Sequence, residues 1–97
     1  MATLIRATDG SESTVRPKTT EGFSLQEVYD LIGNGCDIVE TVQLNDGRIM
    51  LLDEEGKIRN DTLIVNEKAT RLLAEAGGIP GDAVVGNVLI VNELEFP

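Results

Sequence analysis

The densest group of side chains able to do chemistry is a run of three carboxylates, Asp53, Glu54 and Glu55, followed by Gly56. Carboxylates beside a turn glycine can bind a hard cation, and a pair of them can perform acid–base chemistry. However, the alternating oxygen ligands of a calcium loop are missing around Gly56, and an aromatic content of 3% supplies no cleft for sugars. We therefore interpret the run as a solvated turn.

Charges of both signs surround this run and form our candidate binding surface. Its members are Asp46, Arg48, Asp53, Glu54, Glu55, Lys57, Arg59 and Asp61. If these residues flank one hairpin, they form a polar rim that a partner could contact. The simpler interpretation is a set of scattered surface ion pairs, each worth about 0–1 kcal/mol.

Several kinds of catalytic and metal site are excluded by residue types that the sequence lacks. There is no histidine, which rules out Ser-His-Asp and Cys-His catalysis and any His-ligated metal. The single cysteine, Cys36, cannot form a disulfide or a Cys-based metal site within one chain, and we interpret it as a small buried apolar residue. The glycine-rich segment 77–82 lacks the Lys-Ser/Thr ending of a phosphate loop, so a helix end and a turn explain it. We expect no enzyme, no cofactor and no metal.

The balance of charge points to the kind of partner. The chain has 17 acidic and 8 basic residues, which gives a formal net charge of −9. This charge repels nucleic-acid phosphate and favours a basic protein partner, although it also serves plain solubility. No apolar run approaches the roughly 18 residues needed to cross a bilayer, and the start lacks a signal-peptide core. We therefore expect a cytoplasmic protein with no direct contact to nucleic acid or membrane.

Short strands and two helices must position these side chains. The predicted strands span residues 2–7, 12–18, 36–44, 48–52 and 83–94. The β-branched segment 36–44 is expected to be a central strand, and four consecutive apolar residues indicate burial of 48–52 on both faces. For the segment 57–63 the sequence pattern fits a short strand and irregular structure equally well. Whether the last strand pairs within the chain or across a dimer also stays open.

The two helices are predicted from their caps and their apolar stripes. Ser24 and Glu27 make a capping box, with Phe23 and Val28 at the staple positions, and Asn66 caps the second helix. The stripes are Leu25, Val28, Leu31 and Ile32 in the first helix, and Ala69, Leu72, Leu73 and Ala76 in the second. The whole chain, 1–97, is then one α+β domain with a small, mainly antiparallel sheet of about four to five strands and two helices.

The order of short motifs along the chain is similar to that of one family. The motifs are a glycine turn at 33–35 before Ile38-Val39-Glu40, a turn Asp53-Glu54-Glu55-Gly56-Lys57, and a closing segment from Gly81-Asp82 to Ile90-Val91. From Leu4 to Leu94 the chain resembles the domain of unknown function numbered 3846, which occurs in phages, plasmids and other mobile elements. Asn34, inserted between paired glycines, and Asp53, in place of Asn, depart from the family pattern. The resemblance implies a mobile-element setting and no known reaction.

Three hypotheses for the function follow. The leading one is a non-enzymatic phage or mobile-element accessory protein that binds and modulates a host protein, for example by inhibiting a defence factor. The second is a homo-oligomer that sequesters a nucleotide signal, with Arg48, Lys57, Arg59 or Arg71 on its phosphates. The third is an acidic DNA mimic, whose carboxylates would stand in two rows across one face.

Overall fold

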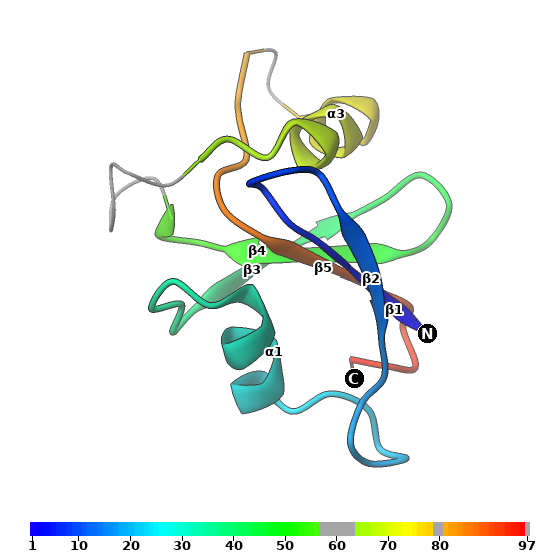
Figure 1. Cartoon of the computed structure of the whole chain (residues 1–97). Helices are drawn as coiled ribbons and strands as arrows, with labels where there is room; N and C mark the ends of the chain where they lie inside the picture. The colour runs from blue at the N-terminus through cyan, green and yellow to red at the C-terminus, as the bar shows by residue number, and fades with distance from the viewer. Residues whose placement is uncertain (57–63, 79–80, 97) are drawn as a thin grey trace.

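Five antiparallel strands form one sheet in the computed structural model, which describes residues 1–56, 64–78 and 81–96. The strands are β1 (Ala2–Ile5), β2 (Glu12–Val15), β3 (Val39–Gln43), β4 (Ile49–Asp53) and β5 (Val88–Val91). Their order across the sheet is β2-β1-β5-β4-β3 (Figure 1). Two helices, α1 (Leu25–Ile32) and α3 (Glu67–Glu75), pack on this sheet. The predicted α+β class is confirmed.

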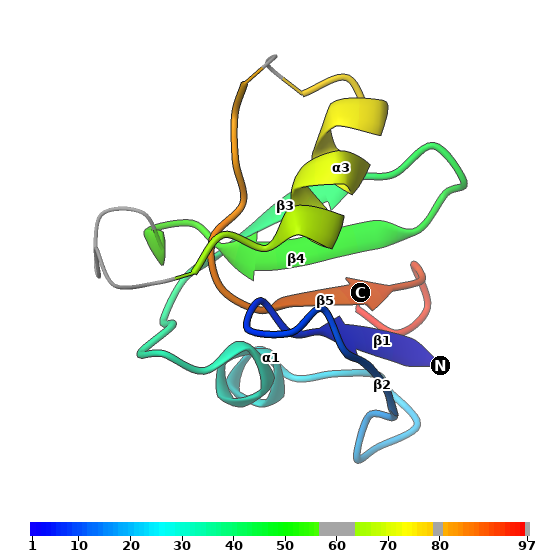
Figure 2. The ribbon, with the colours of Figure 1, turned by 45° about the horizontal axis from the view of Figure 1, so that its top comes forward.

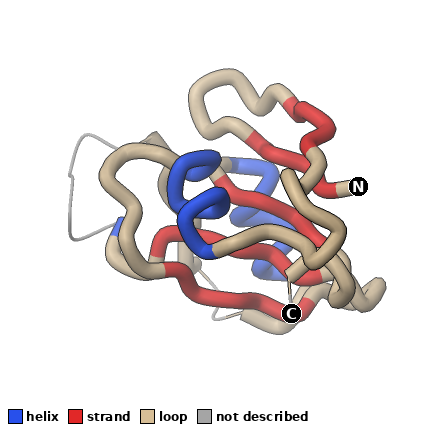
Figure 3. Tube along the Cα trace, turned by 90° about the horizontal axis from the view of Figure 1, so that it is seen from below, coloured by secondary structure: helices blue, strands red, loops and turns tan. Residues whose placement is uncertain are grey.

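The two helices cover opposite faces of the sheet. Figure 2 shows α3 above the strands and α1 below them. Figure 3 views the sheet from the α1 side, and α1 lies in front of the strands there. Successive side chains of a strand point to opposite faces. Leu89 and Val91 of β5 therefore pack on the α1 side, while Val88 and Ile90 pack on the α3 side. The core has two halves, which share the central strands.

The predicted helix caps are confirmed. The backbone N–H of Glu27 donates to Ser24 Oγ at 3.1 Å, and the Ser24 N–H donates to Glu27 Oε1 at 3.1 Å. Phe23 and Val28, at the staple positions, are both buried. Asn66 caps α3, since its Oδ1 accepts from the N–H of Ala69 at 3.1 Å. The predicted stripes also face the sheet, except for Leu25, which is 52% exposed because the first turn of α1 leaves it outside the core.

The last strand occupies the centre of the sheet. β5 pairs with β1 on one side and with β4 on the other, and all four of its residues are buried. Of the two alternatives left open by the sequence, the last strand therefore pairs within the chain and not across a dimer. β4 is also largely buried on both faces, as its apolar run predicted. The hairpins β1–β2 and β3–β4 flank β5, which leaves β2 and β3 as the two edges.

The prediction of a central strand over 36–44 is wrong. β3 is only Val39–Gln43, and it lies at an edge of the sheet with Glu40, Thr41 and Gln43 exposed. Its β-branched residues mark a strand, but their content does not say which strands lie beside it. Cys36, just before β3, is buried and forms no disulfide, in agreement with its interpretation as a core residue.

The ends of the other strands also differ from prediction. The last strand is β5 alone, because Gly86 turns the chain at φ 81° and residues from Asn92 onward form a turn closed by Glu95. β2 ends two residues before Pro17, whose ring cannot donate to a ladder. β4 includes Asp53, which was expected in the following turn. The expectation for 57–63 lies outside the described residues.

Candidate functional site

The structure separates the candidate binding surface into two places. Asp46 and Arg48 lie in the turn before β4, whereas Asp53, Glu54 and Glu55 lie at its other end. The first four residues of β4, 49–52, stand between Arg48 and Asp53. At about 3.3 Å per residue, the two groups are roughly 20 Å apart. They do not form one surface, and Lys57, Arg59 and Asp61 lie outside the described residues.

Asp46 and Arg48 are engaged with each other in the hairpin turn. Asp46 Oδ1 accepts from the backbone N–H of Arg48 at 3.1 Å, and its Oδ2 accepts from Arg48 Nε at 2.7 Å. The Arg48 backbone N–H is the main reason that the pKa of Asp46 lies below its ordinary value. Both side chains are about half exposed, so this pair supports the turn and contributes little net stability.

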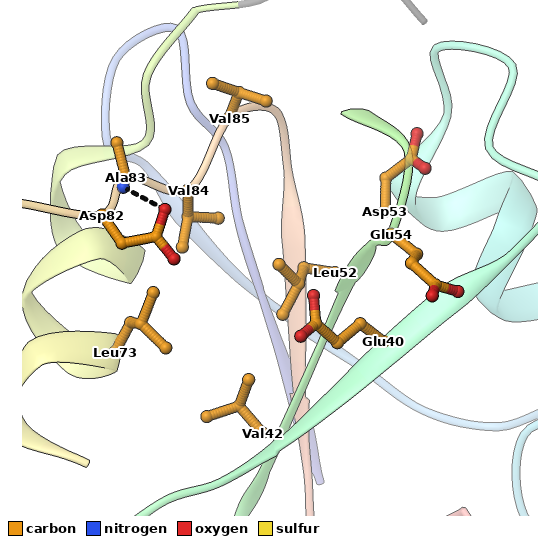
Figure 4. Close-up of a pocket in the computed structure, with 10 residues that line it drawn as sticks. All are labelled: Glu40, Val42, Leu52, Asp53, Glu54, Leu73, Asp82, Ala83, Val84 and Val85. Atoms are coloured by element: carbon orange, nitrogen blue, oxygen red, sulfur yellow. Dashed lines mark hydrogen bonds between the residues drawn. The ribbon is translucent and has the colours of Figure 1, made fainter. Parts of the chain in front are cut away.

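Asp53 has a structural role in the next turn. Its side chain is buried, and its Oδ1 accepts from the backbone N–H of Glu55 at 3.0 Å. In Figure 4 its carboxylate points away from the other side chains drawn. Glu54 and Glu55 are exposed beside it. Asp53 and Glu54 also line a pocket, and Glu54 is the exposed one of the two. Of this carboxylate run, Glu54 is therefore the residue best placed to meet a partner in that pocket.

That pocket opens on the α3 side of the sheet, between β3 and the segment before β5. It is lined by Glu40, Val42, Leu52, Asp53, Glu54, Leu73, Asp82, Ala83, Val84 and Val85, and its volume is about 120 Å³ (Figure 4). By this measure a single water needs only about 10–15 Å³, so the pocket can take the end of a long side chain. All four ionisable side chains in the described lining are carboxylates.

The pocket combines an apolar floor with this acidic rim. Val42 of β3 and Leu52 of β4 lie on the α3 face, where they pack with Leu73 and the buried Val84. Figure 4 shows Glu40 turned over Leu52, with Asp82 on the opposite side of the floor. A Lys or Arg side chain suits such a site, because its aliphatic stem can cover apolar surface while its charged end meets carboxylates.

Hydrogen bonds tie the walls of the pocket to the fold. The backbone N–H of Val84 donates to Thr70 Oγ1 at 2.9 Å, and the Val84 carbonyl accepts from the N–H of Asn66 at 2.7 Å. The segment before β5 is thus held against α3. Asp82 Oδ1 accepts from the backbone N–H of Ala83 at 3.0 Å, which orients that carboxylate at the rim. The pocket is therefore largely preformed.

Sequence reasoning missed Glu40 and Asp82 as members of this site. Each was visible as a charged residue next to an apolar segment: Glu40 within a β-branched strand and Asp82 before the last strand. Their proximity depends on β5 lying beside β4, which pairs residues far apart in sequence. Local pattern contains no signal for that pairing.

A second concavity, which we call the basic groove, lies on the same face between α3 and β1. It is lined by Thr3, Ile5, Glu12, Arg48, Lys68, Arg71, Leu72, Glu75 and Ile90, with a volume of about 360 Å³. The structure thus brings together two predicted phosphate ligands, Arg48 and Arg71. However, Lys68 Nζ is 2.9 Å from Glu12 Oε2, and Arg48 is paired with Asp46. The cations of the groove are mostly neutralised.

Two other kinds of site are absent from the part of the chain that the structure describes. No group of three or more His, Cys, Asp or Glu side chains is arranged there to hold a metal ion. Among the same residues, no helix has the length and apolar character needed to span a membrane.

Comparison of the chain with protein-family models, with curated proteins and with solved structures gives no significant match. The resemblance to the mobile-element family therefore stays a prediction.

Proposed function

We propose that this chain is a non-enzymatic protein that binds a basic segment of another protein in the pocket between β3 and the segment before β5. The observation that carries the proposal is the lining of that pocket, to which Glu40, Glu54 and Asp82 contribute together with the apolar Val42 and Leu52. This combination fits one Lys or Arg side chain of a partner, with its stem on the floor and its charge among the carboxylates.

The charge of the whole chain supports the same proposal. A net charge of −9 attracts a basic partner from a distance and speeds the encounter, with an effect that falls as salt is added. The pocket then supplies the local recognition that net charge alone lacks. A short-range contact with an apolar floor is less sensitive to salt than the encounter itself.

The setting of this activity is proposed from the family resemblance. A phage or mobile-element protein that acts in the host cytoplasm would meet host proteins as its partners. Binding a basic surface of such a protein would modulate it stoichiometrically, and inhibition of a defence factor is one form of this. A basic surface is typical of enzymes that handle nucleic acid, because they must hold phosphates.

A direct binding measurement tests the proposal. The probe is a fluorescein-labelled peptide of about ten residues in which Thr occupies every odd position and Lys and Val take the even positions in turn. We expect it to bind the wild-type protein at low salt. The double variant Glu40→Gln, Glu54→Gln should bind about thirtyfold more weakly, because each of the two lost charges near the lysine is worth about 1 kcal/mol in water.

A matched control separates the pocket from net charge. Glu21 and Glu93 are exposed and lie outside this pocket, so Glu21→Gln, Glu93→Gln removes the same two charges elsewhere. It should bind the probe like the wild type. If the two double variants lose affinity equally, the pocket is not the site and only bulk charge attracts the peptide.

Affinity purification from host lysate with the same three proteins then identifies the partner. A protein captured by the wild type and by the Glu21, Glu93 control, and lost with the Glu40, Glu54 variant, is the expected partner. Host proteins captured equally by all three would count against the pocket.

A second candidate is a site for a nucleotide in the basic groove. It is favoured by the position of Arg71, which forms no ion pair with any described residue and lines the groove beside Lys68 and Arg48. Thermal-shift measurements with nucleoside mono-, di- and triphosphates test it, because a bound ligand raises the Tm by mass action. The rise should vanish in Arg71→Gln and persist in Arg16→Gln, which changes an exposed arginine outside the groove.

The acidic DNA mimic is the least favoured candidate. A mimic presents its carboxylates outward in rows, whereas Glu40, Glu54 and Asp82 stand around an apolar floor. Competition separates the two: a duplex-binding protein displaced from DNA by the Glu40→Gln, Glu54→Gln variant as well as by the wild type would favour the mimic.

A further inference from the structure

The outward side of β3 carries backbone groups that bond to no other residue described by the structure. In an antiparallel ladder, hydrogen-bonded and non-hydrogen-bonded residue pairs alternate. The N–H of Leu44 donates to the carbonyl of Arg48 at 2.9 Å, and the N–H of Glu54 donates to the carbonyl of Ile38 at 3.1 Å. With the register Val42↔Met50 and Glu40↔Leu52, the even-numbered residues of β3 therefore bond to β4. The N–H and C=O groups of Val39, Thr41 and Gln43 point out of the sheet.

This edge lacks three features that commonly block strand addition, and its charged residue is Glu40. Edge strands are commonly protected by Lys, Pro or a bulge. β3 contains neither Lys nor Pro, and its register with β4 runs without interruption over all five residues. The opposite edge differs, because Arg16 and Pro17 directly follow the four residues of β2. Of the two edges, β3 is therefore the better template for an added strand.

The open edge borders the acidic pocket. Glu40 and Val42 bond to β4 through their backbones, and their side chains line the pocket on the α3 face. A sixth strand beside β3 would place every second side chain on that face, next to Glu40 and Val42. A Lys or Arg beside Glu40 could reach over Leu52 toward Asp82. An apolar residue two positions along would lie beside Val42.

We propose that the basic partner segment binds as an added strand on β3, with a basic and an apolar residue alternating on the side that faces the pocket. This inference rests on the proposed function and specifies its mode: main-chain hydrogen bonds to Val39, Thr41 and Gln43 supply affinity, and the acidic pocket supplies selectivity. A second copy of this chain is disfavoured as the occupant, because two copies carry net charges of −9 each and both bring Glu40 to the shared edge.

A proline substitution tests the main-chain bonds without removing a bond of the fold. The N–H of Thr41 points outward, so Thr41→Pro removes a donor to the partner and leaves the β3–β4 ladder complete. Thr14 is its matched control. The N–H of Arg6 donates to the carbonyl of Ser11, so Leu4 and Ala2 bond to β2 through Ser13 and Val15, and the exposed Thr14 also points its N–H outward.

With the Thr/Lys/Val probe peptide, Thr41→Pro should bind about tenfold more weakly than the wild type, while Thr14→Pro should bind equally well. Circular dichroism melts of both variants check that each is folded. Equal affinity of the two proline variants would overturn strand addition, even if the Glu40→Gln, Glu54→Gln variant still upholds the pocket. Failure of the wild type to bind the probe at low salt would overturn the proposed function and this inference together.

A peptide-side test is independent of how the variants fold. In antiparallel addition, the backbone groups of the Thr positions face β3, so N-methylation of those positions should abolish binding and N-methylation of the Lys and Val positions should not. Parallel addition reverses the two series and also supports the inference. Equal binding of both methylated peptides overturns it. A wild-type dimer in light scattering that disappears in Thr41→Pro would also overturn it, because the occupant of the edge would then be a second copy.

Discussion

Asn66 joins three parts of the fold through a single buried side chain, and its removal should be costly. Only 1% of the residue is exposed. Its Oδ1 caps α3 by accepting from Ala69, while its Nδ2 donates to the carbonyl of Ile5 at 3.1 Å and to that of Gly86 at 3.0 Å. The residue thus ties the start of α3 to the end of β1 and to the turn before β5.

The size of the effect of Asn66→Ala can be estimated from these three bonds. Loss of a helix N-cap costs about 1 kcal/mol, and each lost hydrogen bond to a buried carbonyl costs about 1 kcal/mol. The free energy of unfolding should therefore fall by about 3 kcal/mol, a large share of the roughly 5–15 kcal/mol that stabilises a typical domain. For a chain of this length the Tm should drop by roughly 12–24 °C.

Urea unfolding followed by circular dichroism measures this loss, and two further variants partition it. Asn66→Ser keeps a short cap acceptor and loses both donors, so it should lose about 2 kcal/mol. Asn66→Asp keeps the cap acceptor but turns a carboxylate toward two carbonyls, so at neutral pH it should lower the free energy of unfolding at least as much as Asn66→Ser. Acidification should restore part of this loss, because protonation removes the negative charge. A loss below about 1 kcal/mol for Asn66→Ala, or a Ser variant equal to wild type, would refute the reasoning.

Three further predictions concern the cap of α1, the end of α3 and the edge strand. The pKa of Glu27 lies below its ordinary value of 4.5, mainly because the Ser24 N–H donates to its carboxylate. The ionised Glu27 side chain therefore contributes to the free energy of unfolding above pH 4.5, and this contribution is lost as the pH falls through the lowered pKa. The difference in unfolding free energy between wild type and Glu27→Gln should therefore be constant near neutral pH and change below about pH 4.5; a difference that is flat down to pH 3 would contradict this. Gly78→Ala should cost about 1–3 kcal/mol in urea unfolding, because an added Cβ would lie 2.7 Å from Leu73 Cγ and 2.9 Å from the Leu73 carbonyl oxygen; an unchanged midpoint would show that Leu73 moves freely. Glu40→Thr should raise self-association in light scattering at high protein concentration, since it removes the charge from an open edge, and Glu21→Thr should not.

The parts of the fold that the sequence predicts are those set by local bonds. The capping box of Ser24 and Glu27 and the cap by Asn66 each depend on residues three positions apart, and both form as expected. The burial of β4 follows from its own apolar run. Such features need no knowledge of distant segments, because the partners of each bond lie within one turn of chain.

Strand order and the pocket depend on contacts between distant segments. β5 enters between two hairpins, and its pairing with β1 joins residues more than 80 positions apart, such as Leu4 and Leu89. The pairing of β5 with β4 leaves β3 at an edge and brings Asp82 into the same pocket as Glu40. A strand rich in β-branched residues fits a central or an edge position equally well, so the sequence alone predicted the wrong one for β3.

The open edge and the acidic charge are best understood together. An unprotected strand invites pairing with any extended chain, including other copies of the same protein. In this molecule the edge that lacks Lys and Pro carries Glu40 and borders Glu54 and Asp82. Like charge opposes a second copy at this edge, whereas it attracts a basic segment, so the same carboxylates disfavour one occupant and select another. Because the backbone groups of Val39, Thr41 and Gln43 are indifferent to partner sequence, the side chains of the pocket have to carry the discrimination.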